Sequence, residues 1–400
     1  MVSRRELLRQ LGLGAMVTSL PGISFAKAET DARFVLVILR GAADGLAIAA
    51  PYGEGRYRSV RGELAIPAPG TANGLLELDG LFGLHPSLSH IHDLYGKDAA
   101  RLVHAVASPD RDRSHCDGQD VLENGVTSAG GKRDGWLNRA LAPLGGSLGN
   151  EPAIALSQNT PLVLRGANSV TSWAPSQLPD ADEDTLRRIT ALYSQDEFFA
   201  TRLAQALESQ EIAGELDGMQ KSRRRGNDAA RFEAMMVSAG KFLTADGGPQ
   251  IAVVESGGWD THANQGSASG ALANRLAGLD KGLDALREQM GASWPDTVIA
   301  VVTEFGRTVK VNGTRGTDHG TATAALVLGG AVEGGRIVAD WPGLETSSLY
   351  QGRDLYPTTD LRSLFKGILW EHLRIPPSWL DNEVFPGSAS APMTEGLIQS

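Results

Sequence analysis

The sequence predicts an α/β protein in which a mostly parallel central sheet is flanked by helices. Short runs that are apolar on both faces recur along the chain, which is typical of strands covered by helices on either side. Between these runs, apolar residues recur at steps of three and four, the spacing of a buried helix face. Strands that alternate with helices in this way favour a mostly parallel sheet.

The first predicted strand spans residues 34–39, an unbroken apolar run rich in β-branched residues. It breaks at Arg40 and Gly41 into a turn that contains Asp44. Further apolar runs of strand length lie at residues 102–107, 154–156, 251–255, 298–303 and 324–328. Because these runs lack a polar face, we expect them to lie inside the sheet.

Three stretches show the apolar spacing of amphipathic helices. The apolar positions that define them are Phe232, Met235, Met236 and Phe242; Leu276, Leu279, Leu283, Leu286 and Met290; and Leu361, Leu364, Ile368, Leu369 and Leu373. Thr358 or Thr359 is predicted to be the N-cap of the third helix. Since no linker or repeat demands a boundary, residues 29–400 are predicted to form a single domain.

The N-terminal segment, residues 1–28, is predicted to be a twin-arginine signal peptide. The pair Arg4-Arg5 precedes a short apolar stretch at 11–25, and an Ala-x-Ala cleavage pattern follows at 26–28. An amphipathic N-terminal helix is the alternative. The signal predicts recognition by the twin-arginine export machinery and a periplasmic or secreted protein. No other stretch approaches the ~18 apolar residues of a membrane helix, so we expect no span after cleavage.

Composition excludes several classes of protein. The formal net charge of −10 disfavours binding to nucleic acid, because the phosphates would be repelled. Cys116 is the one cysteine, which excludes an intramolecular disulfide framework and a cysteine-based zinc site. A hydrophobic content of 42% is too high for an intrinsically disordered chain.

Polar residues gather where the predicted strands end, which is where parallel α/β sheets bind ligands. Three of the eight histidines fall in these segments, each within two positions of an aspartate: His115, His262 and His319. Carboxylate and imidazole groups together are typical ligands of zinc, manganese or iron. The sequence therefore predicts one polar cleft that can bind a metal.

Simpler structural interpretations stay open for each motif. Asp44 precedes Gly45 and could serve turn formation alone. Asp260 with His262, and Asp318 with His319, could each form a capped turn with a hydrogen-bonded histidine. Five other histidines lie outside such settings and are predicted to be structural: His85, His90, His92, His104 and His372.

Several motifs together resemble a bacterial family of twin-arginine-exported proteins catalogued as domain of unknown function 1501. The motifs lie at residues 39–45, 114–115, 257–262, 303–308 and 316–320, so the resemblance covers nearly the whole mature chain. Residues 298–307, 316–320 and 357–361 more distantly resemble the C-terminal half of alkaline phosphatases and sulfatases. This second resemblance implies an alkaline-phosphatase-like fold and is the one that implies chemistry.

In that superfamily two metals bind Asp and His side chains, and a Ser, Thr or modified Cys nucleophile lies between them. By position, the resemblance implies catalytic roles for Ser114, His115 and Arg307. It implies metal ligation by Asp44, Asp260, His262, Glu304, Asp318 and His319. The implied cofactor is one divalent cation, which could be zinc, manganese, calcium or magnesium.

The sequence departs from the superfamily at one position that should bind metal. Where the superfamily has an Asp-His pair after the fourth strand, this chain has Glu304-Phe305, and a phenylalanine cannot bind a metal. The Asp260-x-His262 spacing is also shorter than the Asp-x-x-x-His of alkaline phosphatase. A single metal on Asp260, His262 and His319 is therefore expected, with Arg307 holding a phosphate or sulfate oxygen.

Two functions of different classes follow from these expectations. The first is a metal-dependent hydrolase of phosphate or sulfate esters, in which Ser114 or a water molecule attacks a small-molecule or glycan ester. The second is a non-catalytic binding module of the same fold in a cell-envelope assembly. The loss of a metal ligand at Phe305 favours the second, since fold alone does not decide function.

Overall fold

The computed structural model describes residues 31–144, 152–175, 183–193, 196–213 and 228–399. The predicted signal peptide, residues 1–28, lies outside the described residues. Among the helices of the described ranges, none is both long enough and apolar enough to cross a membrane.

The described chain is built around a 9-stranded sheet with the strand order β11-β5-β10-β9-β1-β8-β6-β7, in which β12 also pairs with β5. Its strands are β1 Arg33–Leu39, β5 Ala100–Ala107, β6 Ala153–Leu156, β7 Thr171–Ser172, β8 Ile251–Ser256, β9 Thr297–Thr303, β10 Thr323–Leu328, β11 Arg336–Val338 and β12 Thr359–Asp360. All the pairs are parallel except those of β10 with β5 and β9. The predicted mostly parallel sheet is confirmed.

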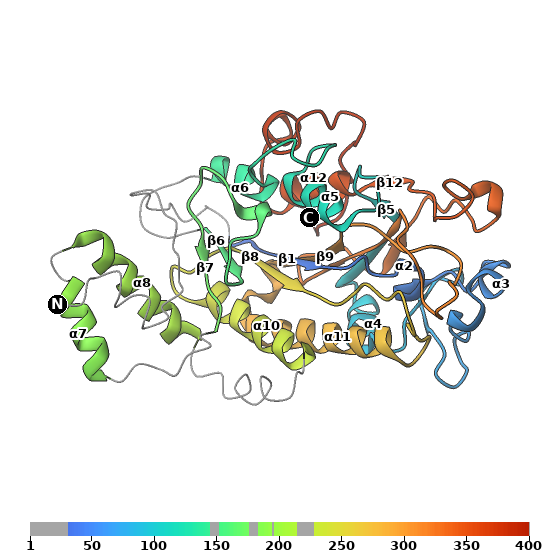
Figure 1. Ribbon diagram of the computed structural model, residues 1–400, viewed down its shortest axis with the longest axis horizontal. Coiled ribbons are helices and arrows are strands. Elements are labelled where there is room, and N and C mark those ends of the chain that lie inside the picture. Colours follow the sequence, from blue (N-terminus) through green and yellow to red (C-terminus); the bar gives the residue numbers. More distant parts are fainter. Residues whose placement is uncertain (1–30, 145–151, 176–182, 194–195, 214–227, 400) are drawn as a thin grey trace.

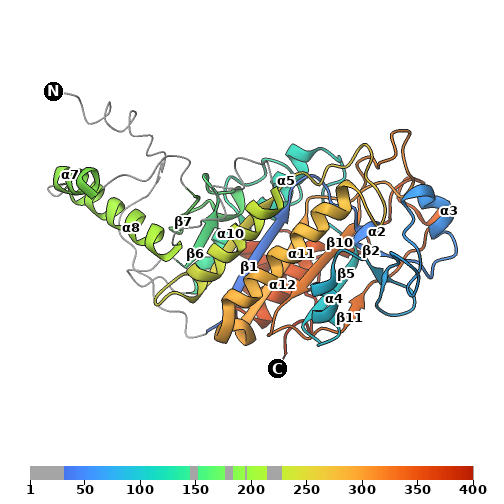
Figure 2. The same cartoon turned by 90° about the horizontal axis from the view of Figure 1, so that it is seen from below.

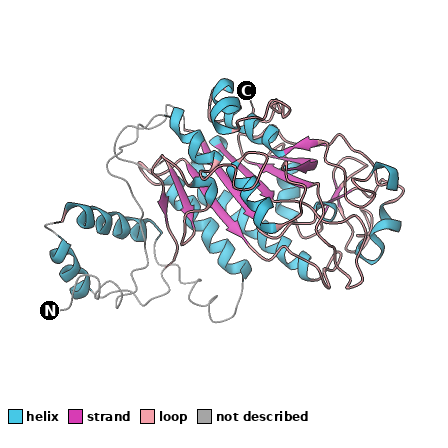
Figure 3. Cartoon of the chain, turned by 45° about the horizontal axis from the view of Figure 1, so that its top comes forward, coloured by secondary structure: helices cyan, strands magenta, loops and turns pink. Residues whose placement is uncertain are grey.

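The central strand β1 shows why the sheet is covered on both faces. Its residues Val35, Val37 and Leu39 pack into one apolar core, and the alternate residues pack into another. The first core is closed by α4 Ser89–Tyr95, α10 Asp228–Thr244 and α11 Ala271–Met290, and the second by α5 His115–Asn124, α6 Trp136–Leu141 and α12 Leu361–Glu371. In Figure 1, α10 and α11 lie below the sheet while α5, α6 and α12 lie above it. Figure 3 shows the same layers with the strands in magenta.

Shorter elements complete the described fold. The 3-stranded sheet β2-β4-β3 comprises Ala49–Ala50, Gly83–Leu84 and Leu76–Glu77. The remaining helices are α2 Gly45–Ile48, α3 Tyr57–Arg61, α7 Glu183–Tyr193, α8 Glu197–Ala213 and α13 Pro377–Trp379. Short 3-10 and π segments are η1 Gly62–Leu64, η2 Ala142–Leu144, η3 Leu162–Leu164, η4 Gly291–Asp296, η5 Thr346–Ser348 and η6 Leu380–Val384. Helices α7 and α8 lie beyond β7 at one end of the molecule (Figures 1 and 2).

The start of α12 differs from the sequence prediction. Its N-cap is Asp360, whose carboxylate accepts a hydrogen bond from the N–H of Arg362 at 2.9 Å. Thr359 belongs instead to β12, where it pairs with Val106 of β5. Because Thr359 pairs in β12, the helix begins one residue later than predicted. Asp360 therefore occupies the N-cap position that a threonine was expected to occupy.

The strand directions bring several loops to one edge of the sheet. β1, β5, β8 and β9 are mutually parallel through their pairings, so their carboxyl ends share that edge. Because β10 runs the other way, its beginning lies there rather than its end. The segment before β10 therefore meets the segments that follow the other strands.

Candidate metal centre

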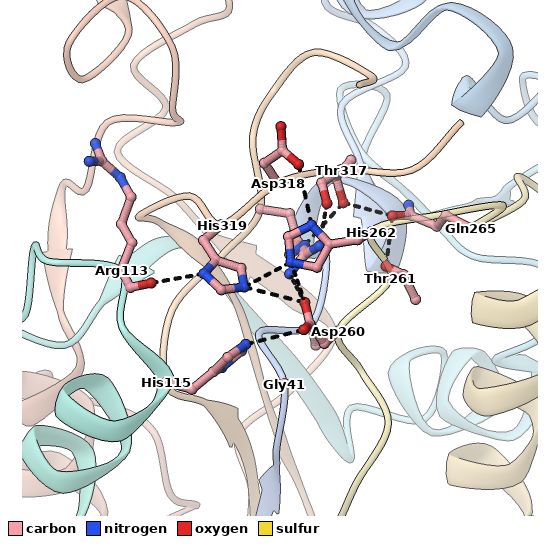
Figure 4. Close-up of polar contacts among 12 residues, drawn as sticks. Gly41, Arg113, His115, Asp260, Thr261, His262, Gln265, Thr317, Asp318 and His319 are labelled. Atoms are coloured by element: carbon pink, nitrogen blue, oxygen red, sulfur yellow. Dashed lines mark hydrogen bonds and ion pairs between the residues drawn. The ribbon is translucent and has the colours of Figure 1, made fainter. Parts of the chain in front are cut away.

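Four of these loops deliver the predicted site residues to the common edge. Asp260 and His262 follow β8, while His115 opens α5 after β5. Glu304 directly follows β9, and His319 precedes β10. Figure 4 shows the side chains of His115, His262 and His319 arranged around Asp260.

Three imidazoles meet the Asp260 carboxylate through their Nε2 atoms. Asp260 Oδ1 lies 3.0 Å from His262 Nε2 and 3.4 Å from His319 Nε2, and Oδ2 lies 3.4 Å from His115 Nε2. The Nε2 atoms of His262 and His319 are themselves 3.0 Å apart. The ligand atoms of His115, Asp260 and His319 all lie within 4.8 Å of one another, a spacing that one metal ion could span.

Each of these imidazoles has an acceptor on its other nitrogen, Nδ1. For His115 it is Glu304 Oε1 at 2.8 Å, and for His262 it is Asp318 Oδ1 at 3.2 Å. For His319 it is the backbone oxygen of Arg113 at 2.8 Å. An acceptor on Nδ1 holds the proton there and leaves the Nε2 lone pair directed at Asp260. The three imidazoles are therefore oriented as metal ligands are.

Glu304 lies behind His115 rather than at the centre of the cluster. Its buried carboxylate also accepts hydrogen bonds from the Gly41 N–H at 2.8 Å, the Thr303 hydroxyl at 2.9 Å and the Gln119 amide at 3.2 Å. Burial alone would raise the pKa of Glu304, but hydrogen bonds from the backbone, His115, Gln119 and Thr303 hold it below its usual value. Glu304, which the sequence predicts as a ligand, is thus an ionised support for a ligand.

Asp260 is the acidic centre of the cluster, and a buried arginine holds it. Arg307 is 1% exposed and donates from Nη1 to Asp260 Oδ1 at 2.6 Å. Burial would raise the pKa of Asp260, but the hydrogen bond and charge of Arg307, helped by His262 and His319, lower it below the usual value. The other nitrogens of Arg307 donate to Thr317, from Nε to Oγ1 at 3.1 Å and from Nη2 to the backbone oxygen. These contacts use three of the five N–H groups of Arg307 and hold its guanidinium against Asp260, whereas the sequence predicts that it holds an ester oxygen.

The surroundings of His319 and Asp318 lower the pKa of both groups. Burial lowers the pKa of His319, and the nearby charges of His115 and Arg307 add to this against the Arg113 carbonyl. A hydrogen bond from Asn312, joined by those of His262, lowers the pKa of Asp318 although partial burial opposes it. His319 is thus neutral and Asp318 ionised near neutral pH, the forms in which imidazole ligates and carboxylate supports.

Asp44 is separated from this cluster by its own partners. It is 0% exposed, and its Oδ2 receives the Arg61 guanidinium and the Gln265 amide, the latter at 2.7 Å. Its Oδ1 accepts from the Leu46 N–H at 3.2 Å, which caps α2. The carboxylate that the sequence predicts as a metal ligand is thus occupied by a buried ion pair and a helix cap.

Ser114 and Phe305 take structural positions next to the imidazoles. Ser114 is the N-cap of α5, and its hydroxyl oxygen accepts from the Asp117 N–H at 3.4 Å. The Phe305 ring stacks on His115 with centroids 5.1 Å apart and lies 5.2 Å from the His319 ring. Gly118 leaves room for it, because a Cβ there would approach the Phe305 ring to 2.8 Å. Phe305 forms an apolar wall that restricts two imidazole planes.

The family model described as "Protein of unknown function (DUF1501)" matches residues 31–376. The chain belongs to this family. The predicted resemblance to domain of unknown function 1501 is thereby confirmed over these residues. The curated proteins contain no match to this sequence.

Two solved structures are similar to this DUF1501 chain at a low level. The C-terminal periplasmic domain of EcEptC from Escherichia coli, in complex with Zn, aligns with a TM-score of 0.34 and 9% identity, covering 78% of this chain and 77% of that one. A phosphonate monoester hydrolase of Agrobacterium radiobacter aligns with a TM-score of 0.34 and 11% identity, covering 77% and 70%. Similarity at this level carries no conclusion about the activity of this chain.

Some residues that shape the site of this DUF1501 chain have no signal in the sequence. Arg61, which neutralises Asp44, lies in the short helix α3 and belongs to no motif. Gln265 reads as an ordinary loop residue, and Thr317 reads only as a spacer between Gly316 and Asp318. The Arg113 carbonyl is a backbone group, so its role at His319 depends on tertiary structure alone.

Proposed function

We propose that this chain binds one divalent transition-metal ion at Asp260 and the surrounding imidazoles, and that it hydrolyses esters of phosphate or sulfate. The observation that supports the proposal is the convergence of three Nε2 atoms on one carboxylate, each imidazole being held by an acceptor on Nδ1. Outer acceptors of this kind accompany histidine ligands in metal proteins.

The donor atoms fit such an ion. His115 Nε2 is shielded from solvent and makes no hydrogen bond, although a buried polar atom without a partner costs about 1–3 kcal/mol. A metal ion would satisfy it. Imidazole nitrogens with a single carboxylate favour zinc, manganese or iron over calcium and magnesium, which prefer oxygen ligands. Within the set that the resemblance implies, we therefore favour zinc or manganese.

The chain's own residues would bind and orient, and the ion would supply the electrophile. An ion of this class lowers the pKa of a bound water to about 7 and polarises an ester oxygen. Glu304 and Asp318 hold His115 and His262 in place, and Phe305 excludes water from one side of the imidazoles. Asp260 and His262 are 39% and 45% exposed, so a small-molecule or glycan ester can reach the site from solvent.

A second candidate function is a metal-binding module without catalysis. The observation that favours it is that three predicted site residues, one metal ligand and two catalytic groups, already have protein partners. Asp44 pairs with Arg61, Ser114 caps α5, and Arg307 is held by Thr317 and Asp260. On this alternative, the protein would bind the metal and take part in a cell-envelope assembly.

Metal content and hydrolysis, measured on the same preparations, separate these functions. The full-length protein and its His262→Ala variant are analysed for bound metals and for hydrolysis of aryl phosphate and aryl sulfate. His90→Ala is the matched control, because His90 is also 45% exposed but pairs with Asp280 on α11. Loss of both the bound metal and the hydrolysis in His262→Ala, with both kept in His90→Ala, supports the enzyme. Metal without hydrolysis supports the binding module, and no metal in the wild-type protein contradicts both.

The proposed place of action is the periplasm, reached through the twin-arginine machinery. The observation that supports this proposal is the Arg4-Arg5 pair ahead of an apolar segment and a cleavage pattern. Replacing both arginines by lysine should retain the precursor in the cytoplasm, as fractionation and immunoblotting would show. Efficient export of that variant would contradict the proposal.

A further inference from the structure

A continuous series of buried polar contacts links the interior of the protein to Asp260. Every member of the series except Asp260 is fully or almost fully buried. Its members, in order from the interior to the site, are Arg61, Asp44, Gln265, Thr317, Arg307 and Asp260.

The direction of each hydrogen bond in this series is fixed by chemistry. The amide nitrogen of Gln265 donates to Asp44 Oδ2 at 2.7 Å, because a flipped amide would place two oxygens against each other. Gln265 Oε1 therefore faces the Thr317 hydroxyl and accepts its proton at 2.8 Å. A hydroxyl has one proton, so the oxygen of Thr317 then presents a lone pair to Arg307 Nε, 3.1 Å away.

Asp260 needs an external support to keep one orientation. It lies in the loop after β8, where the exposed Gly257 and Gly258, the latter with a φ of 86°, precede the buried Trp259. Its own side chain is 39% exposed. A carboxylate on such a loop would otherwise sample several rotamers. Of the contacts that the Asp260 carboxylate makes with Arg307 and the three imidazoles, that of Arg307 Nη1 with Oδ1 at 2.6 Å is the shortest, and it favours one of these rotamers.

We propose that Gln265 and Thr317 are positioning residues of the metal centre, which act through Arg307 to hold the Asp260 carboxylate toward the three imidazoles. This inference rests on the proposed function, since it assigns a role at the same site. A carboxylate oriented in advance loses less conformational freedom when it binds an ion, so the series raises metal affinity. Removing one outer contact should then weaken binding roughly 10-fold, the lower end of the range for such partners.

The test is the affinity of the full-length protein for Co²⁺, measured by calorimetry and by the visible spectrum of the bound ion. Thr317→Val removes the hydroxyl that joins Gln265 to Arg307, whereas Thr317→Ser keeps it. Thr323→Val is the matched control, because Thr323 is 3% exposed and its hydroxyl donates to the Ala43 backbone at 2.9 Å, outside the series. We expect weaker binding and a changed spectrum in Thr317→Val, near-wild-type values in Thr317→Ser, and no comparable change in Thr323→Val.

A second measurement needs no metal and separates this inference from the proposed function. In ¹⁵N NMR spectra, the Arg307 Nε–H should exchange with water slowly in the wild type and in Thr323→Val, but faster in Thr317→Val. If the wild type binds no Co²⁺, the proposed function fails, and the positioning role fails with it even where the exchange result holds. Equal losses of Co²⁺ affinity in Thr317→Val and Thr323→Val, or unchanged Arg307 exchange in Thr317→Val, would overturn the inference by itself.

Discussion

Two aspartates at the same edge of the sheet have opposite surroundings. Asp44 follows β1 and is 0% exposed, with Arg61 and Gln265 against its carboxylate. Asp260 follows β8, is 39% exposed, and faces imidazoles as well as Arg307. Both carboxylates pair with a permanently charged guanidinium, but Asp260 also faces three imidazoles, which can exchange a proton for a metal ion. The partner, rather than the position at a strand end, decides which carboxylate can be a ligand.

Removing the charge of Asp44 should have the largest effect on stability. Asp44→Asn leaves the fully buried guanidinium of Arg61 without a counter-charge, and breaking a buried pair in this way costs about 3–5 kcal/mol. The free energy of unfolding in urea measures the loss. Asp318→Asn is the control, because Asp318 is 51% exposed and should change stability little. A loss at Asp44 as small as that of the control would remove the contrast between the two aspartates.

The buried His104 should make the folded protein less stable in acid. Burial lowers the pKa of His104 to about 4, although hydrogen bonds to the Ala49 and Gly45 backbone oppose this. The unfolded chain, with a histidine pKa of about 6.5, binds this proton more readily. The stabilising contribution is therefore complete above pH ~6.5 and is lost as the pH falls toward ~4, by about 3 kcal/mol. Urea unfolding of wild type and His104→Gln at pH 7 and pH 4.5 checks this, and equal pH dependence in both would contradict it.

Asp260→Asn should destabilise less than Asp44→Asn and abolish metal binding. The variant weakens a charge-assisted hydrogen bond to Arg307, a loss of about 2 kcal/mol, but the exposed site lets water replace part of it. Elemental analysis and urea unfolding on the same preparation report both quantities. A variant that keeps its metal would place Asp260 among structural carboxylates with Asp44.

The smallest of these effects concerns the support behind His115. Glu304→Gln keeps the shape of the side chain but removes the charge at the His115 Nδ1 contact of 2.8 Å. Metal affinity should fall about 10-fold, since outer-shell partners of histidine ligands contribute 10–100-fold. Competition with a chromogenic chelator measures it. Unchanged affinity would mean that His115 needs no charged support.

The sequence reveals the sheet because six of its strands are long apolar runs, and it misses β7, β11 and β12 because these contain only two or three residues. It cannot show that β10 is antiparallel, because the run at 324–328 is apolar whichever way it points. Asp260, His262 and His319 are recognisable as one group because each lies beside another candidate ligand in a strand-end motif. Asp44 also follows an apolar run at a strand end, and the tertiary contact with Arg61 shows that it serves another purpose.

The reversed strand β10 has a consequence for how the centre is assembled during folding. β9 and β10 are neighbours joined at the site edge, and the chain between them folds back on itself, with Thr308 N–H bonded to Asp318 at 2.9 Å and Gly320 N–H to Gly306 at 2.8 Å. Contacts over so few residues close quickly, whereas Asp260 and His115 must come from distant parts of the sequence. We therefore expect the segment from Arg307 to His319 to form an early nucleus onto which the remaining ligands dock late.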